Sequence, residues 1–292
     1  MSRRITIGRL LSTYLQDRNG VVVRLDRIQT SIDHLEPVFG NMKLSELTRS
    51  AVQGYTAARV KTGVQPQTAR RELVTLRAAL RLAWRDGVID RVPPIPMPSK
   101  GRCRERVLSA QEIRAVLAAT AVRPRCHAFL RLLIATCGRA AAVCELTWAQ
   151  VDLERRTIDL RSSSPMAPRM KGRAVVPITA ELVTFLRAYR NAPDLQTGRG
   201  RRAAPGQRVV GLAVTTVRQH LAEAAAIAGV AGVTPHVIRH SVATQMLRAG
   251  VPLAMVSKML GHASVAITAD VYGHLDTQDL MPAASILDAW AR

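Results

Sequence analysis

Two histidines and an arginine stand close together at the predicted start of one helix near the C-terminus. Thr234 and Pro235 favour a helix that begins there, because Thr is a common N-cap and Pro suits the first helical position. His236, Arg239 and His240 follow at spacings that place them on one face of that helix. Backbone N–H groups and the helix dipole already favour an anion at this end, so the segment predicts a phosphate-binding site.

His236 and His240 also have the i, i+4 spacing of a zinc-binding helix. Val237 occupies the position where that motif needs a glutamate base, and Arg239 would bring a positive charge against the cation. The sequence therefore predicts no metal at this site. Two histidines that bind backbone carbonyls at a helix start remain the plain structural alternative.

A second group of candidates follows, with Leu260-Gly261-His262 and then Tyr272 ten residues after the histidine. The run of residues 236–274 resembles the C-terminal signature of the tyrosine recombinases, the phage integrase family. That signature is an H-x-x-R-H helix, an L-G-H turn and a tyrosine nine or ten residues further on.

Two upstream residues extend the resemblance over nearly the whole chain. Arg139 follows a Thr136-Cys137-Gly138 stretch and lies nine residues before Trp148, which opens a W-x-x-V-D segment as in the family. Lys171 precedes the stretch Val176-Pro177-Ile178, as the family's active-site lysine precedes a V-P-[LI] strand end.

The resemblance implies a catalytic set that cuts and rejoins DNA through a covalent 3′-phosphotyrosyl intermediate. The two arginines would bind non-bridging phosphate oxygens with their planar forks, and Lys171 or His236 would protonate the leaving 5′-oxygen. No cofactor, metal or ATP is implied, because the phosphotyrosine keeps the energy of the phosphoester. The implied catalytic residues are Arg139, Lys171, His236, Arg239, His262, which binds the phosphate, and the nucleophile Tyr272, with His240 supporting Tyr272.

The chain departs from the family pattern at several positions. Cys137 stands where a glycine is usual, and Ala142 stands where a glutamate is common, so Glu145 is a candidate to orient Arg139 instead. The spacing from Lys171 to the strand end is short, which makes Arg169 a rival for the hairpin position.

The fold must bring these distant residues together. Residues 5–88 predict a small helical bundle, broken near Gly20, Gly40 and Gly63. A helix at residues 67–84 has a leucine stripe and several arginines on its other faces, for which phosphate contact and simple solvation both remain open. The arginines predicted to bind DNA are Arg70, Arg71 and Arg77.

The second half of the chain also reads as mainly helical. Ser109 caps a helix from residue 110, a second runs from about 127 to 136, and an Ala-rich helix reaches about 147. Residues 157–160 and 174–178 predict a β-hairpin with Lys171-Gly172 near its turn. Residues 198–207 predict a basic loop that contains Gly and Pro, and the remainder is expected to be helical. In the helix after Thr234 the stripe Ile238, Val242 and Met246 is expected to be buried.

A Pro-rich stretch, residues 93–98, cannot continue a helix and predicts an extended linker. Lys100, Arg102 and Arg104 follow it and are expected to bind DNA. The expected organisation is a helical core-binding domain (1–92), a linker (93–106) and a catalytic domain with a C-terminal tail (107–292). The fold class is mainly α with a small β-hairpin or sheet, in two domains that clamp a duplex.

The composition points to a polyanionic partner, because 42 Lys and Arg face 21 Asp and Glu and give a net charge of +21. Aromatic residues make up only 3%, which argues against stacking of single-stranded bases as the main binding mode. The four cysteines form no CxxC pair, and no apolar run approaches membrane-span length. We therefore expect reduced thiols, no membrane partner and a cytoplasmic location with the nucleoid.

These observations predict a site-specific recombinase or integrase that acts on double-stranded DNA. We expect a monomer or weak oligomer in free solution. The resemblance implies a tetramer on DNA, in which residues 280–290 pack on a neighbour, and packing of this tail on its own domain remains the alternative. A type IB topoisomerase, which only relaxes supercoils, and a non-catalytic helical DNA-binding regulator remain alternatives. Strand exchange between two sites would distinguish a recombinase from a topoisomerase. A covalent protein–DNA adduct would distinguish both enzymes from the non-catalytic regulator.

Overall fold

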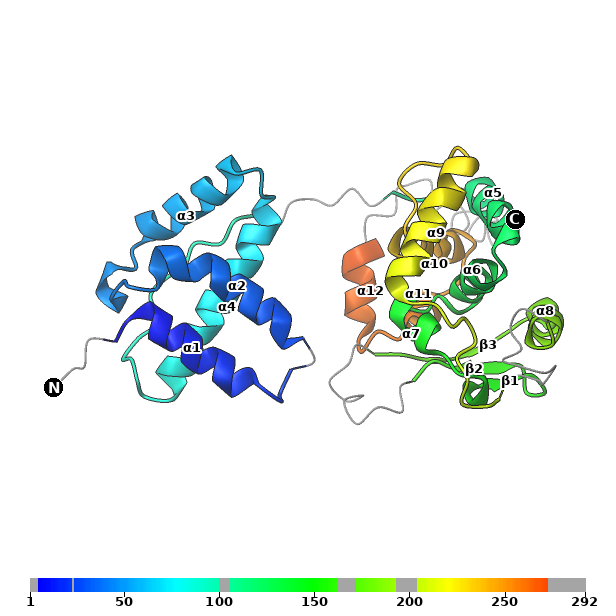
Figure 1. Ribbon diagram of the computed structural model, residues 1–292, viewed down its shortest axis with the longest axis horizontal. Coiled ribbons are helices and arrows are strands. Elements are labelled where there is room, and N and C mark those ends of the chain that lie inside the picture. Colours follow the sequence, from blue (N-terminus) through cyan, green and yellow to red (C-terminus); the bar gives the residue numbers. More distant parts are fainter. Residues whose placement is uncertain (1–4, 23, 100–105, 162–171, 193–203, 273–292) are drawn as a thin grey trace, which may run out of the picture. The chain divides into compact units, whose positions relative to one another are not determined.

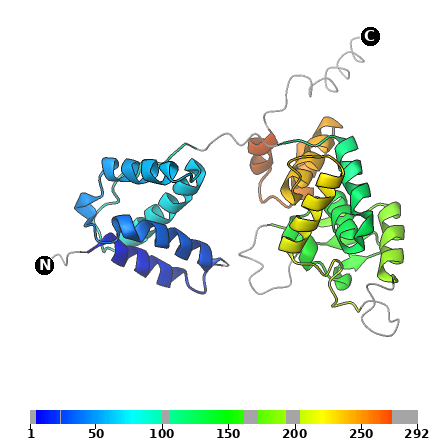
Figure 2. The same cartoon turned by 45° about the horizontal axis from the view of Figure 1, so that its top comes forward.

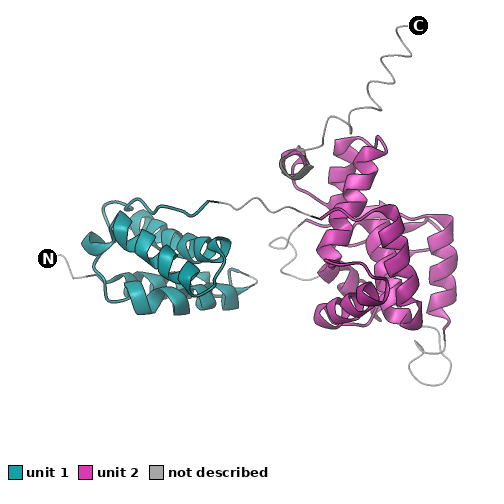
Figure 3. Cartoon of the chain, turned by 90° about the horizontal axis from the view of Figure 1, so that it is seen from above, with its two compact units in different colours: residues 1–104 teal, residues 105–292 magenta. Residues whose placement is uncertain are grey.

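The computed structural model describes residues 5–22, 24–99, 106–161, 172–192 and 204–272. It divides the chain into two compact units, residues 1–104 and 105–292, coloured teal and magenta in Figure 3. Each unit has its own hydrophobic core. The boundary between the units falls inside the stretch predicted as a linker.

The first unit is a bundle of helices in which α4 packs against each of the other three (Figure 1). Its elements are α1 (Ile7–Arg18), α2 (Leu25–Phe39), a 3-10 turn η1 (Leu44–Glu46), α3 (Arg49–Lys61) and α4 (Pro66–Arg85). The predicted breaks near Gly20, Gly40 and Gly63 fall between these helices. The leucine stripe Leu73, Leu76 and Leu80 of α4 is fully buried, so the predicted bundle is confirmed.

A charged side chain lies inside this bundle. Glu72 of α4 is only 3% exposed, yet it has three donors within hydrogen-bond distance. The Tyr55 hydroxyl donates to Glu72 at 2.6 Å, and the Arg59 guanidinium donates to both carboxylate oxygens at 3.0 and 2.5 Å. These bonds join α3 to α4 and compensate the buried carboxylate.

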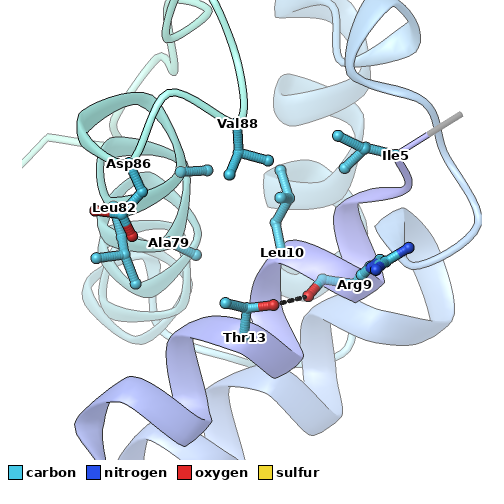
Figure 4. Close-up of a pocket in the computed structure, with 9 residues that line it drawn as sticks. Ile5, Arg9, Leu10, Thr13, Ala79, Leu82, Asp86 and Val88 are labelled. Carbon is cyan, nitrogen blue, oxygen red and sulfur yellow. Dashed lines mark hydrogen bonds between the residues drawn. The ribbon is translucent and has the colours of Figure 1, made fainter. Parts of the chain in front are cut away.

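An apolar cavity of about 200 Å³ lies between α1 and α4 in the first unit (Figure 4). Beside it, the Thr13 hydroxyl donates to the Arg9 carbonyl at 3.0 Å. None of the predicted site residues lines this cavity, whose walls are Ile5, Arg9, Leu10, Thr13, Ala79, Leu82, Ala83, Asp86 and Val88.

The second unit combines a small three-stranded sheet with several helices. Its N-terminal elements are α5 (Ala110–Ala119), η2 (Thr120–Val122), α6 (Pro124–Thr136), α7 (Ala140–Glu145), η3 (Trp148–Gln150), β1 (Val151–Asp152), β2 (Thr157–Asp159) and β3 (Val175–Pro177). Its C-terminal elements are α8 (Ala180–Arg190), α9 (Val214–Ile227), α10 (Pro235–Arg248), α11 (Leu253–Leu260) and α12 (Val265–Tyr272). Ser109 caps α5 as predicted, because its hydroxyl accepts from the Glu112 amide while the Glu112 carboxylate accepts from the Ser109 amide.

The sheet has the order β1-β2-β3 with antiparallel neighbours. Ile158 pairs with Val176 in register, and both side chains face the core at 0% and 1% exposure. The predicted β-hairpin is therefore confirmed in its strands. Its turn lies outside the described residues, together with Lys171 and Arg169.

Helix α10 lies against both α6 and α11 (Figure 1; Figure 2). The hydroxyl of Ser241 in α10 accepts from the Leu108 amide at 2.7 Å, which ties the helix to the segment before α5. Neighbours on several sides explain why α10 carries buried polar residues as well as apolar ones.

The cysteines within the described residues are buried and unpaired. Burial raises the pKa of Cys126, Cys137 and Cys144 to about 11 in each case. Cys103 lies outside the described residues. Over the same described part of the chain, no helix combines the length and apolar character that a membrane crossing needs.

Candidate active site

Helix α10 begins as predicted, because the Thr234 hydroxyl accepts from the Val237 amide at 3.1 Å. The three candidate side chains near its start differ in exposure. His236 is exposed, whereas Arg239 and His240 are only 7% and 8% exposed. The three do not form one solvent-facing anion site.

The expected buried stripe of α10 is also wrong in part. Ile238 is buried, but Val242 and Met246 are only half-buried, while Arg239 and His240 are buried instead. The physical reason is that α10 is enclosed by α6, α11 and the segment before α5, so no single face decides burial.

Arg239 joins two distant segments through its guanidinium. One NH group donates to the carbonyl of Cys137, and the other donates to the carbonyl of Leu260 at 2.9 Å. The second NH group also lies 3.5 Å from Nε2 of His262. A planar fork that only donates is suited to hold two carbonyls in one plane. Arg239 therefore sets the position of the loop before α7 relative to the end of α11.

That loop places Arg139 directly before α7. Helix α6 ends at Thr136 and is followed by the C-cap residue Cys137, whose φ of 47° and ψ of 28° are left-handed. The Gly138 amide then donates to the Thr136 hydroxyl at 3.1 Å. A side chain on Gly138 would crowd Leu160, as well as Thr136 itself. The close packing around this turn thus favours a glycine at the residue before Arg139.

The Arg139 guanidinium reaches the residue that follows Lys171. It donates to the carbonyl of Gly172, where the hairpin enters the described part of the chain again. Burial and the neighbouring charge of Arg173 hold the pKa of Arg139 below its usual value. A guanidinium nevertheless stays protonated in proteins, so two like charges lie close together here.

Two glycines make the hairpin and the end of α11 meet. Gly261 caps α11 with a φ of 61°, a left-handed conformation that glycine adopts without a Cβ penalty. Its carbonyl faces Gly172 so closely that a Cβ at Gly172 would approach it to well under 3.0 Å. Gly172, which follows Lys171, is thereby held beside Gly261, which precedes His262.

His262 follows this contact and is held at both ring nitrogens. Its Nδ1 lies 2.8 Å from the Thr268 hydroxyl, and its Nε2 lies near Arg239. Burial lowers the pKa of His262, and the charges of Arg239 and Arg139 lower it further. The ring is therefore neutral at neutral pH.

Tyr272 is the last residue of α12, which packs against α11. Only its backbone position belongs to the described part of the chain. The structure thus brings Arg139, Arg239 and His262 together with the residue after Lys171, and it gives the end of α12 as the position of Tyr272.

Two residues at this site carried no signal that sequence reasoning used. Arg173 binds Glu145 at 2.6 Å, so the Glu145 carboxylate pairs with Arg173 rather than with Arg139, which was its expected partner. Thr268 is fully buried against the His262 ring from six residues away. Such pairings depend on how α11, α12 and the hairpin meet, and a sequence period does not contain that information.

The predicted DNA-binding arginines of α4 differ in their surroundings. Arg70 donates to the Pro98 carbonyl at 2.6 Å and so ties the Pro-rich stretch to its own unit. Arg71 is exposed and Arg77 is half-buried. Lys100, Arg102 and Arg104 lie outside the described residues. Among the residues that are described, no group of three or more His, Cys, Asp or Glu could hold a metal ion.

Comparison with known proteins relates this chain to one family, both by its family model and by individual relatives. Residues 106–279 match the model of the phage integrase family. The tyrosine recombinase XerD of Mycobacterium tuberculosis is 32% identical over 218 residues, which cover 69% of this chain and 68% of that protein.

Two solved structures share the fold at lower identity. The Tn1549 transposon integrase in complex with transposon right end DNA matches with a TM-score of 0.79 at 18% identity, over 99% of this chain and 100% of that one. A lambda integrase tetramer bound to a Holliday junction matches with a TM-score of 0.71 at 17% identity, over 92% of this chain and 78% of that one.

Proposed function

The chain belongs to the phage integrase family of tyrosine site-specific recombinases, and we propose that it breaks and rejoins duplex DNA through a 3′-phosphotyrosyl bond to Tyr272. One observation carries the proposal. Arg139 and Arg239 lie 100 residues apart in sequence, yet their charges meet around His262 beside the hairpin residue Gly172. Positive groups concentrated in this way fit a phosphodiester.

The two arginines compensate the negative charge of the phosphate. Attack on a phosphodiester raises negative charge on the equatorial oxygens, and positioned donors stabilise it most where water is excluded. Arg239 is only 7% exposed and therefore acts in such surroundings, whereas Arg139 is half-buried. In the proposed mechanism they bind the non-bridging oxygens, and His262 adds a donor from its Nε2.

The proposed cleavage step forms a bond from Tyr272 to phosphorus and breaks the bond from phosphorus to the 5′-oxygen. The Tyr272 oxygen attacks phosphorus, its proton passes to a base for which His240 is the candidate, and the P–O5′ bond breaks. Lys171 gives a proton to the departing 5′-oxygen, with His236 as its rival. Rejoining reverses the step when a 5′-hydroxyl attacks the phosphotyrosine and releases the phenol. Two guanidinium groups supply positive charge to the phosphate, and the phosphotyrosine keeps the energy of the phosphoester, so we expect no need for a metal ion or ATP.

The proposed substrate is double-stranded DNA. The net charge of +21 favours a polyanion, and Arg71 and Arg77 of α4 are offered as backbone contacts together with Lys100, Arg102 and Arg104. Because Arg70 already binds Pro98, we assign it a part in holding the Pro-rich stretch as well. The nucleoid is the corresponding location.

We further propose that four copies act together on DNA and exchange strands between two sites. The related lambda integrase was solved as a tetramer on a Holliday junction. Residues 280–290, which lie outside the described residues, are the proposed contact between neighbours.

Trapping on a nicked suicide substrate tests the proposal. Wild-type protein should form a covalent protein–DNA band in EDTA, whereas Tyr272→Phe should bind the same DNA with unchanged affinity and form none. A band that survives in Tyr272→Phe removes Tyr272 from the role, and a band that needs added Mg²⁺ or Zn²⁺ removes the metal-free mechanism. Relaxation without exchange between two sites would indicate a topoisomerase, and no band with any substrate would indicate a non-catalytic DNA-binding protein.

A further inference from the structure

The hydrogen bond between His262 and Thr268 crosses the turn from α11 to α12. The Thr268 hydroxyl lies 2.8 Å from Nδ1, and Thr268 is fully buried although Val265 and Ile267 of the same helix are exposed. A buried hydroxyl that approaches an imidazole nitrogen at this distance fixes how the ring is turned.

The other ring nitrogen limits where the proton of His262 can be. A neutral imidazole carries one N–H, and Arg239, 3.5 Å from Nε2, can only donate. This neighbour favours Nε2 as the acceptor in the DNA-free protein. We infer that the proton is then on Nδ1, from which it is donated to Thr268.

A bound phosphate reverses these requirements. Its oxygens only accept, so His262 must present Nε2–H to them, and Nδ1 must then accept a hydrogen bond. The ring keeps the same charge and carries its single proton on Nε2 in place of Nδ1, by exchange with water. A threonine hydroxyl can accept in the first state and donate in the second.

We propose that Thr268 is a positioning residue, which keeps His262 hydrogen-bonded in both tautomers and aligns Nε2 with the scissile phosphate. The proposal rests on the function proposed above. Thr268 also stands four residues, about one helical turn, before Tyr272 in α12. The same bond therefore sets the spacing between α12 and the phosphate-binding histidine.

The chain offers a matched control for this bond. Thr120 is 1% exposed, and its hydroxyl lies 3.0 Å from Nδ1 of the half-buried His127, which makes a second Thr–His pair at the end of α5. Thr268→Val and Thr120→Val each remove one hydroxyl from such a pair at nearly constant volume. Thr268→Ser keeps the hydroxyl in place.

Single-turnover cleavage of the suicide substrate is the first measurement. Thr268→Val should cleave at least about tenfold more slowly than wild type with unchanged DNA affinity, since the His262 ring loses its partner. Thr268→Ser and Thr120→Val should stay within about twofold of wild type. Equal rates for Thr268→Val and wild type would overturn the proposal, as would equal losses in Thr268→Val and Thr120→Val.

Imidazole ¹⁵N spectra of the DNA-free protein give a second measurement that needs no activity. His262 should show a protonated Nδ1 and an unprotonated Nε2 at neutral pH in wild type and Thr268→Ser, and a mixture of tautomers in Thr268→Val. An unprotonated Nδ1 in wild type overturns the proposal even if Thr268→Val does not fold. If the wild-type protein forms no covalent adduct with DNA, the proposed function is wrong, whereas these spectra still test the His262–Thr268 hydrogen bond.

Discussion

Replacing Gly172 by alanine tests whether the meeting of the hairpin and the end of α11 belongs to the working site. The new Cβ would stand well under 3.0 Å from the Gly261 carbonyl oxygen, a distance that real Cβ atoms essentially never show. Neither side can yield through a flexible side chain, because the crowded atoms are backbone. The two segments must part by about 1 Å, and a misplacement of that size can cost about a hundredfold in rate.

The displacement would act on the site in two ways. It moves the Gly172 carbonyl, which accepts from Arg139, and it separates Gly172 from Gly261, the residue before His262. We expect Gly172→Ala to bind DNA with nearly wild-type affinity and to cleave the suicide substrate between about ten and a hundred times more slowly.

Gly206→Ala is the matched control in the same unit, because a Cβ there would meet no atom within 4 Å. Single-turnover cleavage and DNA affinity should both match wild type in this variant. If Gly172→Ala also cleaves at the wild-type rate, the close approach of the two glycines has no part in catalysis, and the site must be assembled differently.

Three further outcomes are expected from the same structure. Lys171→Ala should be slow on normal DNA and rescued by a 5′-bridging phosphorothioate, whose leaving thiolate needs no proton; Arg169→Ala should show only a salt-dependent binding defect, and equal loss on both substrates for Lys171→Ala would assign the proton elsewhere. Burial lowers the pKa of His127, so the unfolded chain binds its proton more tightly than the folded chain does. The free energy of unfolding should therefore rise with pH through the ordinary histidine pKa of 6.5. In urea unfolding at several pH values, His127→Gln should flatten that rise, and an unchanged slope would contradict this origin. Glu72→Gln should lower the free energy of unfolding of the first unit by about 2–4 kcal/mol in urea, since the Arg59 cation loses its counterion; a loss below about 1 kcal/mol would show that the pair is effectively solvated.

The helices were predictable because their signals are local. Ser109 and Glu112 satisfy each other's backbone within one turn, and Thr234 caps α10 in the same way, so no distant contact is needed to start either helix. The strands at Ile158 and Val176 were likewise found from their β-prone residues. Each of these elements is decided by residues within a few positions of one another.

The surroundings of the site residues were not predictable in this way. Periodicity placed Arg239 and His240 outside the predicted buried stripe, yet both are buried because α10 has neighbours on several sides. Glu145, a candidate to orient Arg139, pairs with Arg173 instead, and no local pattern encodes the approach of the hairpin that carries Arg173. Tertiary contacts decide burial and pairing, and they join segments more than a hundred residues apart, as between Arg239 and Cys137 at 102 residues and between Ser241 and Leu108 at 133.

Cys137 shows which part of a motif a site requires. Glycine is usual at this position in the family, and the left-handed φ of 47° explains the preference, because a side chain there costs about 1–2 kcal/mol. The cysteine offsets part of that cost by packing, fully buried, against Ala243, Val256 and Leu260. What Arg239 binds is the Cys137 carbonyl, whose direction follows from the backbone conformation and not from the side chain. The site therefore tolerates the departure as long as the backbone at residue 137 stays left-handed.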